Sequence, residues 1–349
     1  DVTVQNRLVS QGELKKLMPH MEAQTILAGL DLTKEKQFFL SDPDYLQHFD
    51  ALYTADNLDL LKSYAVYQVY NGFAPMAHIK LRDLQRDYLR QRFGIAKARD
   101  DKETASRMVQ SMLSYEVGQI YMKNHSTAAV VDDVKDMIRE IRDVYKLRLE
   151  ANDWLSPKTR AKAIEKLNSL RVFVGGPADD DKPIIESMPD VIAPQDGGDL
   201  LTNIMHNSVL ERQQVHALLG TNFNPDKWYA FAPQDVNAAY IPENNSITIP
   251  AGILQPPFYD TKASRGANLG GIGVVIGHEI SHAFDPNGSK YDSEGRLKNW
   301  WTRRDSEAFQ KLSAAFGPYY DNYTVGKGLH ENGKLVSNEA IADCGGLSV

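Results

Sequence analysis

The sequence has a single cysteine, Cys344, among its 349 residues, which excludes an intramolecular disulfide. It also lacks an excess of positive charge, since the formal net charge is −7, whereas surfaces that bind nucleic acids are usually basic. No apolar run reaches the length of about 18 residues that a membrane-spanning helix needs. We therefore expect no nucleic-acid partner and no membrane span. The remaining composition, with 42% hydrophobic and 24% charged residues, is typical of a soluble globular protein.

The first 170 residues are expected to be almost entirely helical. Apolar residues recur at three- and four-residue spacing, as on one face of a helix, in the segments 12–30, 56–71, 78–93, 104–123 and 128–152. Ser156 and Pro157 predict the start of a further helix, because serine caps the first turn and proline needs no hydrogen-bond donor there. Residues 1–170 are thus predicted to form a helical domain.

The composition changes after Arg171. Gly, Pro and Asp are frequent from 172 to 199, which predicts loops rather than a packed element. After a helix expected over about 199–219, short β-like runs follow at 227–231, 236–242 and 246–250. Asn244 and Asn245, between the last two runs, predict the turn of a hairpin. Helices are expected again from Gly270, over about 302–320 and near Asn338, so residues 171–349 are predicted to form a mixed domain.

The segment from Gly270 to Gly288 carries two histidines and a glutamate within five residues, His278, Glu279 and His282. Residues four apart lie on the same face of a helix, so the two histidines project together. Imidazole nitrogens are typical zinc ligands, and a catalytic zinc keeps one position open for water. Glu279 lies about 100° around the helix from His278 and can reach that water as a general base. This is the H-E-x-x-H pattern of metallopeptidases.

The alternative is a buried helix that carries these polar residues by chance. The residues from Gly270 to Gly277 are all apolar or glycine, which favours burial of the helix. Two unpartnered imidazoles and a carboxylate would be costly to bury there, and a bound metal removes that cost. The pattern and its apolar context together therefore predict a zinc site.

Two carboxylates further along the chain offer a third zinc ligand. Glu339 and Asp343 are four residues apart and share one face of a predicted helix. One of them can bind the zinc, and the other can accept the second ring N–H of a zinc-bound histidine. Most carboxylate pairs with this spacing are solvated surface charges, and the residues alone leave the two roles open.

Four segments resemble the neprilysin family of zinc endopeptidases, in particular its bacterial oligopeptidase O type: 236–259, 270–302, 338–346 and, more weakly, 128–167. The resemblance implies a mainly α (α+β) fold. A thermolysin-like zinc-metallopeptidase catalytic domain with a small β-sheet is expected over 171–349, capped by a large all-helical domain over 1–170. The resemblance also implies one zinc ion, Zn2+, per chain.

The resemblance assigns roles to residues at matching positions. The implied zinc ligands are His278, His282 and Glu339. Glu279 is implied as the general base, Asp343 as the residue that orients His278, and Asp285 as a further partner behind the ligands. The implied substrate-binding residues are Asn237 and Ala238, for the peptide main chain, and Ile253, Phe258 and Val275, for an apolar pocket. Ordinary core packing is the alternative for these last three.

The resemblance implies an endopeptidase that hydrolyses small peptides on the N-terminal side of hydrophobic residues. In this family a histidine and an arginine well downstream of the glutamate ligand stabilise the oxyanion, and this sequence ends at Val349. We therefore expect an interior piece of a longer enzyme, with both domains incomplete. The alternative is a catalytically incomplete zinc- and peptide-binding fragment, active only with a C-terminal segment or a second chain. The resemblance favours the bacterial periplasm, cell envelope or exterior, with the cytoplasm as the alternative.

Overall fold

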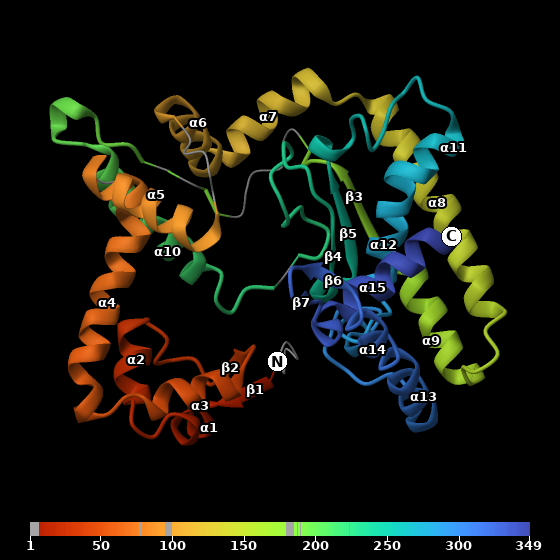
Figure 1. Ribbon diagram of the computed structural model, residues 1–349, viewed down its shortest axis with the longest axis horizontal. Coiled ribbons are helices and arrows are strands. Elements are labelled where there is room, and N and C mark those ends of the chain that lie inside the picture. The colour runs from red at the N-terminus through yellow and green to blue at the C-terminus, as the bar shows by residue number, and fades with distance from the viewer. Residues whose placement is uncertain are drawn as a thin grey trace. The chain divides into compact units, whose positions relative to one another are not determined.

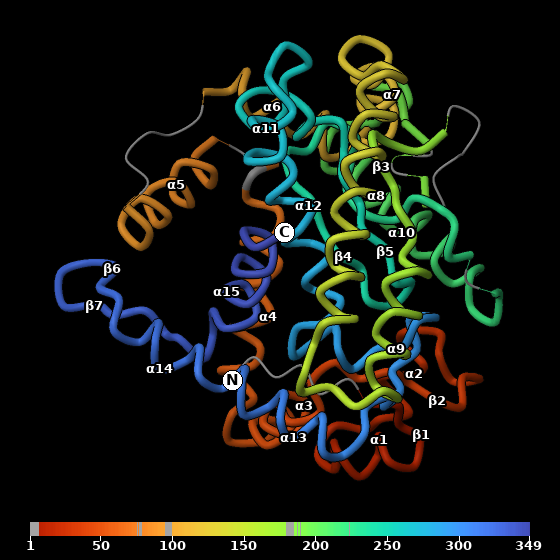
Figure 2. Tube along the Cα trace, turned by 90° about the vertical axis from the view of Figure 1, so that its right-hand side faces the viewer, coloured from red at the N-terminus to blue at the C-terminus, as the bar shows by residue number. Residues whose placement is uncertain are grey.

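The computed structural model of the chain describes residues 7–76, 79–94, 100–178, 185–186, 188, 190–222 and 224–349. The chain divides into two compact units, residues 1–103 with 190–206 and residues 104–189 with 207–349, whose elements are drawn in Figures 1 and 2. The expected domain boundary between residues 170 and 171 lies inside the second unit. The assignment of a cap to 1–170 and of a catalytic domain to 171–349 therefore stays a prediction.

The first unit has a small apolar core near its N-terminus. Its elements are β1 (Arg7–Ser10), α1 (Gln11–Leu17), α2 (Ala23–Gly29), β2 (Gln37–Leu40), α3 (Pro43–Ala51), α4 (Leu58–Phe73) and α5 (Ile79–Phe93). The strands β1 and β2 pair antiparallel. The apolar segment 12–30 forms two helices, because Pro19 cannot extend α1. The buried Asp50 holds the turn between them by accepting hydrogen bonds from the backbone N–H groups of His20 and Met21.

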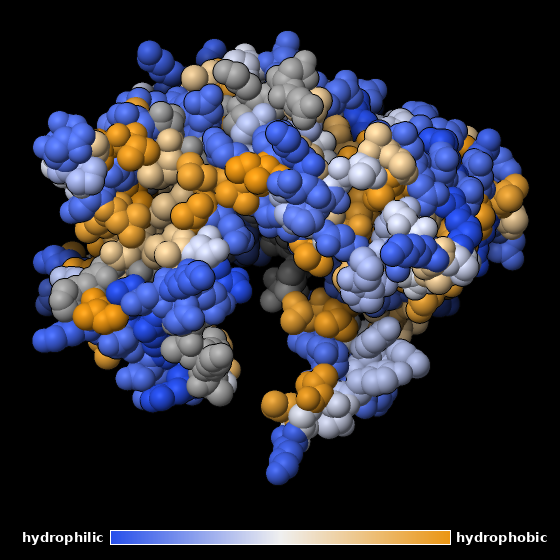
Figure 3. All heavy atoms as spheres, turned by 90° about the horizontal axis from the view of Figure 1, so that it is seen from above, coloured by the Kyte–Doolittle hydropathy of each residue, from blue (hydrophilic) through white to orange (hydrophobic). Residues whose placement is uncertain are grey.

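Helix α4 is predicted correctly from its apolar spacing, but that spacing does not bury it. Within the described chain none of its residues is buried, and Leu60 and Val66 are 67% and 55% exposed. Figure 3 shows apolar residues, in orange, lying among polar residues, in blue, on the face that it draws. Of the helices in the described ranges, none combines the length and the apolar character needed to cross a membrane.

The second unit contains a three-stranded sheet in the order β3-β5-β4. The strand β3 (Arg171–Gly175) runs parallel to β5 (Ser246–Pro250), and β4 (Ala239–Ile241) runs antiparallel to β5 (Figure 1). The predicted hairpin is thus confirmed. Its turn places Asn245 at a φ of 46°, a left-handed conformation that asparagine adopts more readily than most residues.

Two local predictions in this unit are wrong. Residues 171–175 form β3 and not a loop, because Val172 and Val174 pair with β5 far along the chain, a partner that local Gly and Pro content does not reveal. Residues 227–231 form no strand. Phe231 has a φ of 51°, which is incompatible with extended backbone, and its carbonyl oxygen accepts the indole N–H of Trp228 at 2.8 Å.

The α-helices from residue 101 onward are α6 (Asp101–Met112), α7 (Ser114–His125), α8 (Ala128–Glu150), α9 (Pro157–Asn168), α10 (Leu200–Ala217), α11 (Arg265–Asn268), α12 (Val274–His282), α13 (Arg303–Ser313), α14 (Phe316–Tyr320) and α15 (Gly333–Ser348). Ser156 caps α9 as predicted. The helix predicted over 302–320 is two helices, α13 and α14. The helix predicted near Asn338 begins earlier, where Asn332 caps α15. The strands β6 (Thr324–Gly326) and β7 (Leu329–His330) form a small sheet and lie between α14 and α15 in the sequence.

The core of the second unit joins helices and sheet around α12. Fully buried isoleucines come from three elements: Ile138 from α8, Ile247 from β5, and Ile276 from α12. Burial of such side chains is the main favourable contribution to folding. This core therefore sets the position of α12, the helix that carries the H-E-x-x-H residues.

Candidate metal centre

Helix α12 presents its apolar and polar residues on different faces. Ile276 and Ile280 are fully buried in the core. His278 lies two residues from each of them, and His282 lies two residues after Ile280, which is roughly 200° around the helix in each case. Packing of the isoleucines therefore turns both imidazoles away from the core and onto one common face.

Glycines bring α15 close to α12. A Cβ atom at Gly277 would lie 2.9 Å from Cα of Gly346, and a Cβ at Gly346 would lie 2.5 Å from the carbonyl oxygen of Val274. Both distances are too short for any side chain, so this close approach requires glycine at both positions. As a result, Glu339 and Asp343 on α15 reach the histidines of α12.

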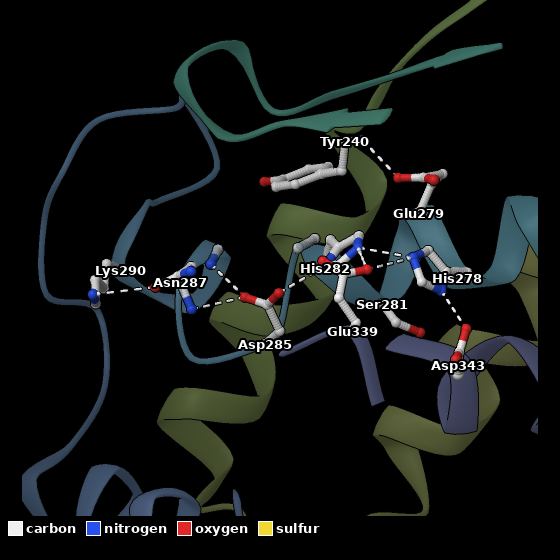
Figure 4. Close-up of polar contacts among 12 residues, drawn as sticks. Tyr240, His278, Glu279, Ser281, His282, Asp285, Asn287, Lys290, Glu339 and Asp343 are labelled. Atoms are coloured by element: carbon white, nitrogen blue, oxygen red, sulfur yellow. Dashed lines mark hydrogen bonds and ion pairs between the residues drawn. The ribbon is translucent and has the colours of Figure 1, made fainter. Parts of the chain in front are cut away.

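Three potential ligand atoms converge at this point (Figure 4). Nε2 of His278 lies 2.9 Å from Nε2 of His282, and Oε2 of Glu339 lies 3.3 Å and 3.6 Å from these two nitrogens. On the other side of each ring, Nδ1 of His278 hydrogen-bonds to Asp343 at 2.8 Å and Nδ1 of His282 hydrogen-bonds to Asp285 at 2.7 Å. The structure thus brings together five of the residues that the sequence singled out.

This arrangement fits a zinc ion. The carboxylates of Asp343 and Asp285 accept, so each Nδ1 carries a proton, and the lone pair of each Nε2 is the one that can bind a metal. These two lone pairs and the Glu339 carboxylate face one another. Acceptors this close repel one another, and a cation bound between them would remove the repulsion. A tetrahedral zinc with bonds of about 2.0–2.2 Å separates its ligand atoms by about 3.3–3.6 Å. The two distances from Oε2 of Glu339 to the imidazole nitrogens match this range, and the distance of 2.9 Å between the two nitrogens is shorter. The residues that would hold zinc are His278, His282 and Glu339.

Glu279 lies beside these atoms but is held by a different element. Its carboxyl group is buried, and Oε2 accepts the backbone N–H of Tyr240 in β4 at 2.8 Å. Ligand-type atoms of Glu279, His278 and His282 all lie within 4.8 Å of one another. Burial raises the pKa of Glu279 above its ordinary value, although the neighbouring histidines act in the opposite direction. A carboxylate in this position can exchange a proton with a group bound at the centre.

Asp285 is the more firmly held of the two carboxylates behind the histidines. It is buried, and Oδ1 accepts the backbone N–H groups of Asn287 and Gly288, both at 2.7 Å. Burial tends to lower the pKa of His282, but the hydrogen bond and charge of Asp285 outweigh this effect and raise it. The loop after α12 thus orients one imidazole from behind, in the way that partners of metal-bound histidines commonly do.

Comparison with known proteins identifies the family of this chain. Residues 1–177 and residues 237–349 match the profiles of peptidase family M13. The chain belongs to peptidase family M13, the neprilysin family. It is similar to the neutral endopeptidase of Lactococcus lactis subsp. lactis, with 31% identity over 342 residues that cover 97% of this chain and 53% of the relative.

Two solved structures of M13 metalloproteases resemble the whole chain. The crystal structure of PepO from Lactobacillus rhamnosis has a TM-score of 0.88 and 33% identity, covering 100% of this chain and 54% of that one. The Mycobacterium tuberculosis zinc metalloprotease Zmp1, in complex with an inhibitor, has a TM-score of 0.86 and 29% identity, covering 100% and 53%. The predicted family and mainly helical fold are thus confirmed. The chain spans about half the length of these relatives.

The substrate-binding residues expected for an M13 peptidase are less clearly placed. Asn237 is exposed just before the edge strand β4, and its side-chain oxygen accepts the backbone N–H of Ala238 at 2.9 Å. Ile253 is buried in the core, and Phe258 and Val275 pack against it. These three are at least partly core residues, and their role in an apolar pocket stays a prediction.

Sequence reasoning missed two tyrosines that support this M13 site. Tyr240 reaches Glu279 through its backbone N–H, which no side-chain pattern signals. The hydroxyl of Tyr145, on α8, donates to the carbonyl oxygen of Gly277 at 2.8 Å and contacts Ser281. Burial raises the pKa of Tyr145 to about 12, so the hydroxyl keeps its proton for this hydrogen bond. A signal for Tyr145 was its place on the apolar side of the helix over 128–152.

Proposed function

We propose that this chain is the zinc-binding part of an endopeptidase that hydrolyses small peptides on the N-terminal side of hydrophobic residues. The observation that carries the proposal is the convergence of His278, His282 and Glu339, with Glu279 held beside them by β4. Membership of peptidase family M13 and the similarity to a neutral endopeptidase support the same conclusion. The cellular location stays a prediction of the sequence.

In the proposed reaction the chain's own residues position the reactants and move protons. When bound, zinc would supply Lewis-acid polarisation of the scissile carbonyl and would lower the pKa of the attacking water. Glu279 accepts a proton from that water and later delivers a proton to the leaving amine. Asp343 and Asp285 keep the two imidazoles in the tautomer that leaves Nε2 free to bind the metal.

The proposed path of the peptide is along β4. This strand lies at the edge of its sheet, and an extended peptide can add to such an edge through main-chain hydrogen bonds. Asn237 and Ala238 precede β4 directly, and Asn237 is exposed. A bound peptide would exchange the hydrogen bond between these two residues for its own main-chain contacts. Because Glu279 is tied to Tyr240 in the same strand, a peptide bound there would lie next to the general base.

The decisive experiment is the substitution Glu279→Gln. Glutamine keeps the size of the side chain but accepts no proton, so we expect hydrolysis of a quenched-fluorescent peptide to fall by about 100-fold or more, with zinc content unchanged. Glu243→Gln changes an exposed carboxylate in the turn after β4, so it is the matched control and should alter neither quantity. Loss of zinc together with activity would make Glu279 a ligand and contradict its role as base.

A second candidate function follows from the length of the chain relative to the M13 peptidases. Because it spans about half of those relatives, the chain can be a zinc- and peptide-binding fragment that lacks residues needed for turnover. The same assay separates the two functions. A wild-type chain that binds one zinc and binds peptide without cleaving it supports the fragment, whereas chelator-sensitive cleavage supports the complete enzyme.

A further inference from the structure

Lys166 is a buried cation that the proposed reaction does not use. It lies on the buried face of α9, next to Ala163 and Leu167, and only 1% of its surface is exposed. Burial lowers the pKa of Lys166 to about 7, while the charges of Asp285 and Asp292 act in the opposite direction. A lysine in the interior is costly unless its ammonium group is well paired, so its contacts are informative.

The ammonium group of Lys166 closes the loop that follows α12. It donates three hydrogen bonds, to the carbonyl oxygens of Ala283 at 2.8 Å, Gly288 at 2.7 Å and Tyr291 at 2.8 Å. A lysine ammonium has three N–H donors, so every one of them is used on this loop. The loop over 283–291 is therefore gathered around one buried charge.

The same loop aims Asp285 at the metal centre. Gly288 offers its carbonyl oxygen to Lys166 and donates its N–H to Oδ1 of Asp285, while Oδ2 of Asp285 accepts from Nδ1 of His282. Gly288 also packs against the end of α12, because a Cβ atom there would lie 1.8 Å from the carbonyl oxygen of His282. One glycine thus links the buried lysine to the carboxylate that orients the histidine.

A second set of contacts joins Lys166 to the strand that holds Glu279. Nζ lies 5.6 Å from the centre of the Tyr240 ring, a cation–π contact, and the backbone carbonyl of Lys166 accepts from the side-chain amide of Asn245 at 3.0 Å. Asn245 in turn accepts the hydroxyl of Tyr240 at 3.0 Å. The lysine therefore lies where the loop after α12 and the β4–β5 hairpin meet.

We propose that Lys166 is a positioning residue for the metal centre, whose ammonium group holds the loop over 283–291 in the conformation that aims Asp285 at His282. The proposal rests on the proposed function, since it takes His282 as a zinc ligand. It differs from a purely structural role in one respect. A variant without the ammonium group must weaken zinc binding at His282 more than a variant that lowers the stability of the fold equally but leaves Lys166 intact.

The test is Lys166→Met, which keeps a long side chain and removes all three donors. We expect the dissociation constant for Zn2+, measured by competition with a chromophoric chelator, to rise by about 10–100-fold, the range typical of a lost partner behind a metal ligand. Because Lys166 acts through Asp285, the double variant with Asp285→Asn should bind zinc no more weakly than the weaker single variant. Fully additive effects would contradict the proposal.

Leu167→Ala is the matched control. Leu167 is the next residue of α9 and is also buried in the core, so its truncation destabilises the fold but removes none of the hydrogen bonds that Lys166 donates to the loop. Its zinc dissociation constant should stay within about twofold of the wild type at temperatures where both variants are folded. If Lys166→Met has no larger effect than Leu167→Ala, the lysine is only structural. Should Lys166→Met fail to fold, Lys166→Gln, which keeps an amide donor without the charge, replaces it in the same comparison.

A measurement without metal separates this proposal from the proposed function. In the zinc-free chain, NMR exchange of the Nδ1 proton of His282 reports its hydrogen bond to Asp285 directly. We expect exchange to be faster by on the order of tenfold in Lys166→Met, because the loop opens more often. Failure of the wild-type chain to bind zinc would contradict the proposed function but would leave this readout intact. An unchanged exchange rate would overturn the role of Lys166.

Discussion

The two histidines of the metal centre are oriented by carboxylates in opposite surroundings. Asp285, behind His282, has a side chain only 4% exposed and accepts two further backbone N–H groups from its own loop. Asp343, behind His278, has a side chain 65% exposed on the last helix, α15. The two hydrogen bonds have nearly equal lengths, 2.7 Å and 2.8 Å, so distance alone does not reveal the difference.

The comparison teaches that the two halves of the candidate centre are held by contacts of different burial. Behind His282, the buried Asp285 is held by backbone N–H groups of its own loop, and that loop is in turn held by Lys166 of α9. The His278 half depends on α15, where Glu339 and Asp343 are both 65% exposed and water competes for their contacts. A pre-organised partner contributes more to metal binding than one that must be ordered on binding.

The largest effect on zinc binding is expected at Glu339, the exposed carboxylate of α15 that is itself a proposed ligand. Glu339→Ala should weaken zinc binding by more than about 100-fold, the upper range for a lost partner behind a ligand, because it removes one of the three proposed ligands. Glu294→Ala removes a carboxylate of the same 65% exposure and should leave the zinc dissociation constant unchanged. Unchanged zinc occupancy in Glu339→Ala would mean that the third ligand is another residue, and it would contradict the assignment of a ligand to α15.

A smaller effect should separate the two orienting carboxylates. Asp285→Asn should raise the zinc dissociation constant by about 10–100-fold, and Asp343→Asn by clearly less, because water can take the place of an exposed carboxylate behind His278. Both variants keep the size of the side chain, so the same chelator competition compares them directly. Equal effects, or a larger effect for Asp343→Asn, would mean that burial does not decide their contributions.

The smallest effect on zinc binding is expected at Asp305, which supports the start of α9. Its substitution should instead lower the free energy of unfolding. This fully buried carboxylate accepts from the backbone N–H of Ser156 at 3.1 Å and from the hydroxyl of Thr302 at 2.6 Å. Burial alone would raise the pKa of Asp305, but hydrogen bonds from Ser156, Thr159 and Thr302 outweigh it and hold the pKa well below its usual range.

A lowered pKa in the folded state means that the ionised form stabilises the fold above the unfolded-state pKa of about 3.9, and that this contribution is lost as the pH falls below it. Asp305→Asn should therefore be less stable than the wild type at pH 7, by roughly 1–3 kcal/mol in free energy of unfolding. Denaturant titrations at pH 7 and near pH 3 should show this gap narrowing in acid. A gap that is independent of pH would contradict the assignment.

Much of the local structure could be predicted because it depends on neighbours in sequence. Apolar spacing predicted α8, and Ser156 with Pro157 predicted the start of α9. The errors occur where a distant partner decides. The run over 227–231 has β-forming residues but no strand partner in the described structure, whereas β3 forms because β5 lies beside it. Likewise, the apolar spacing of α4 predicted a helix but could not show that nothing in the described chain buries it.

The candidate site divides in the same way. The spacing of His278, Glu279 and His282 determines by itself that the two imidazoles share one face, because helical geometry is local. Only the tertiary structure decides that α15 approaches α12 through Gly277 and Gly346, which brings Glu339 to the histidines. It alone also places a buried lysine from α9 under the loop that carries Asp285. Such contacts join residues far apart in sequence, and packing of the shared core brings them together.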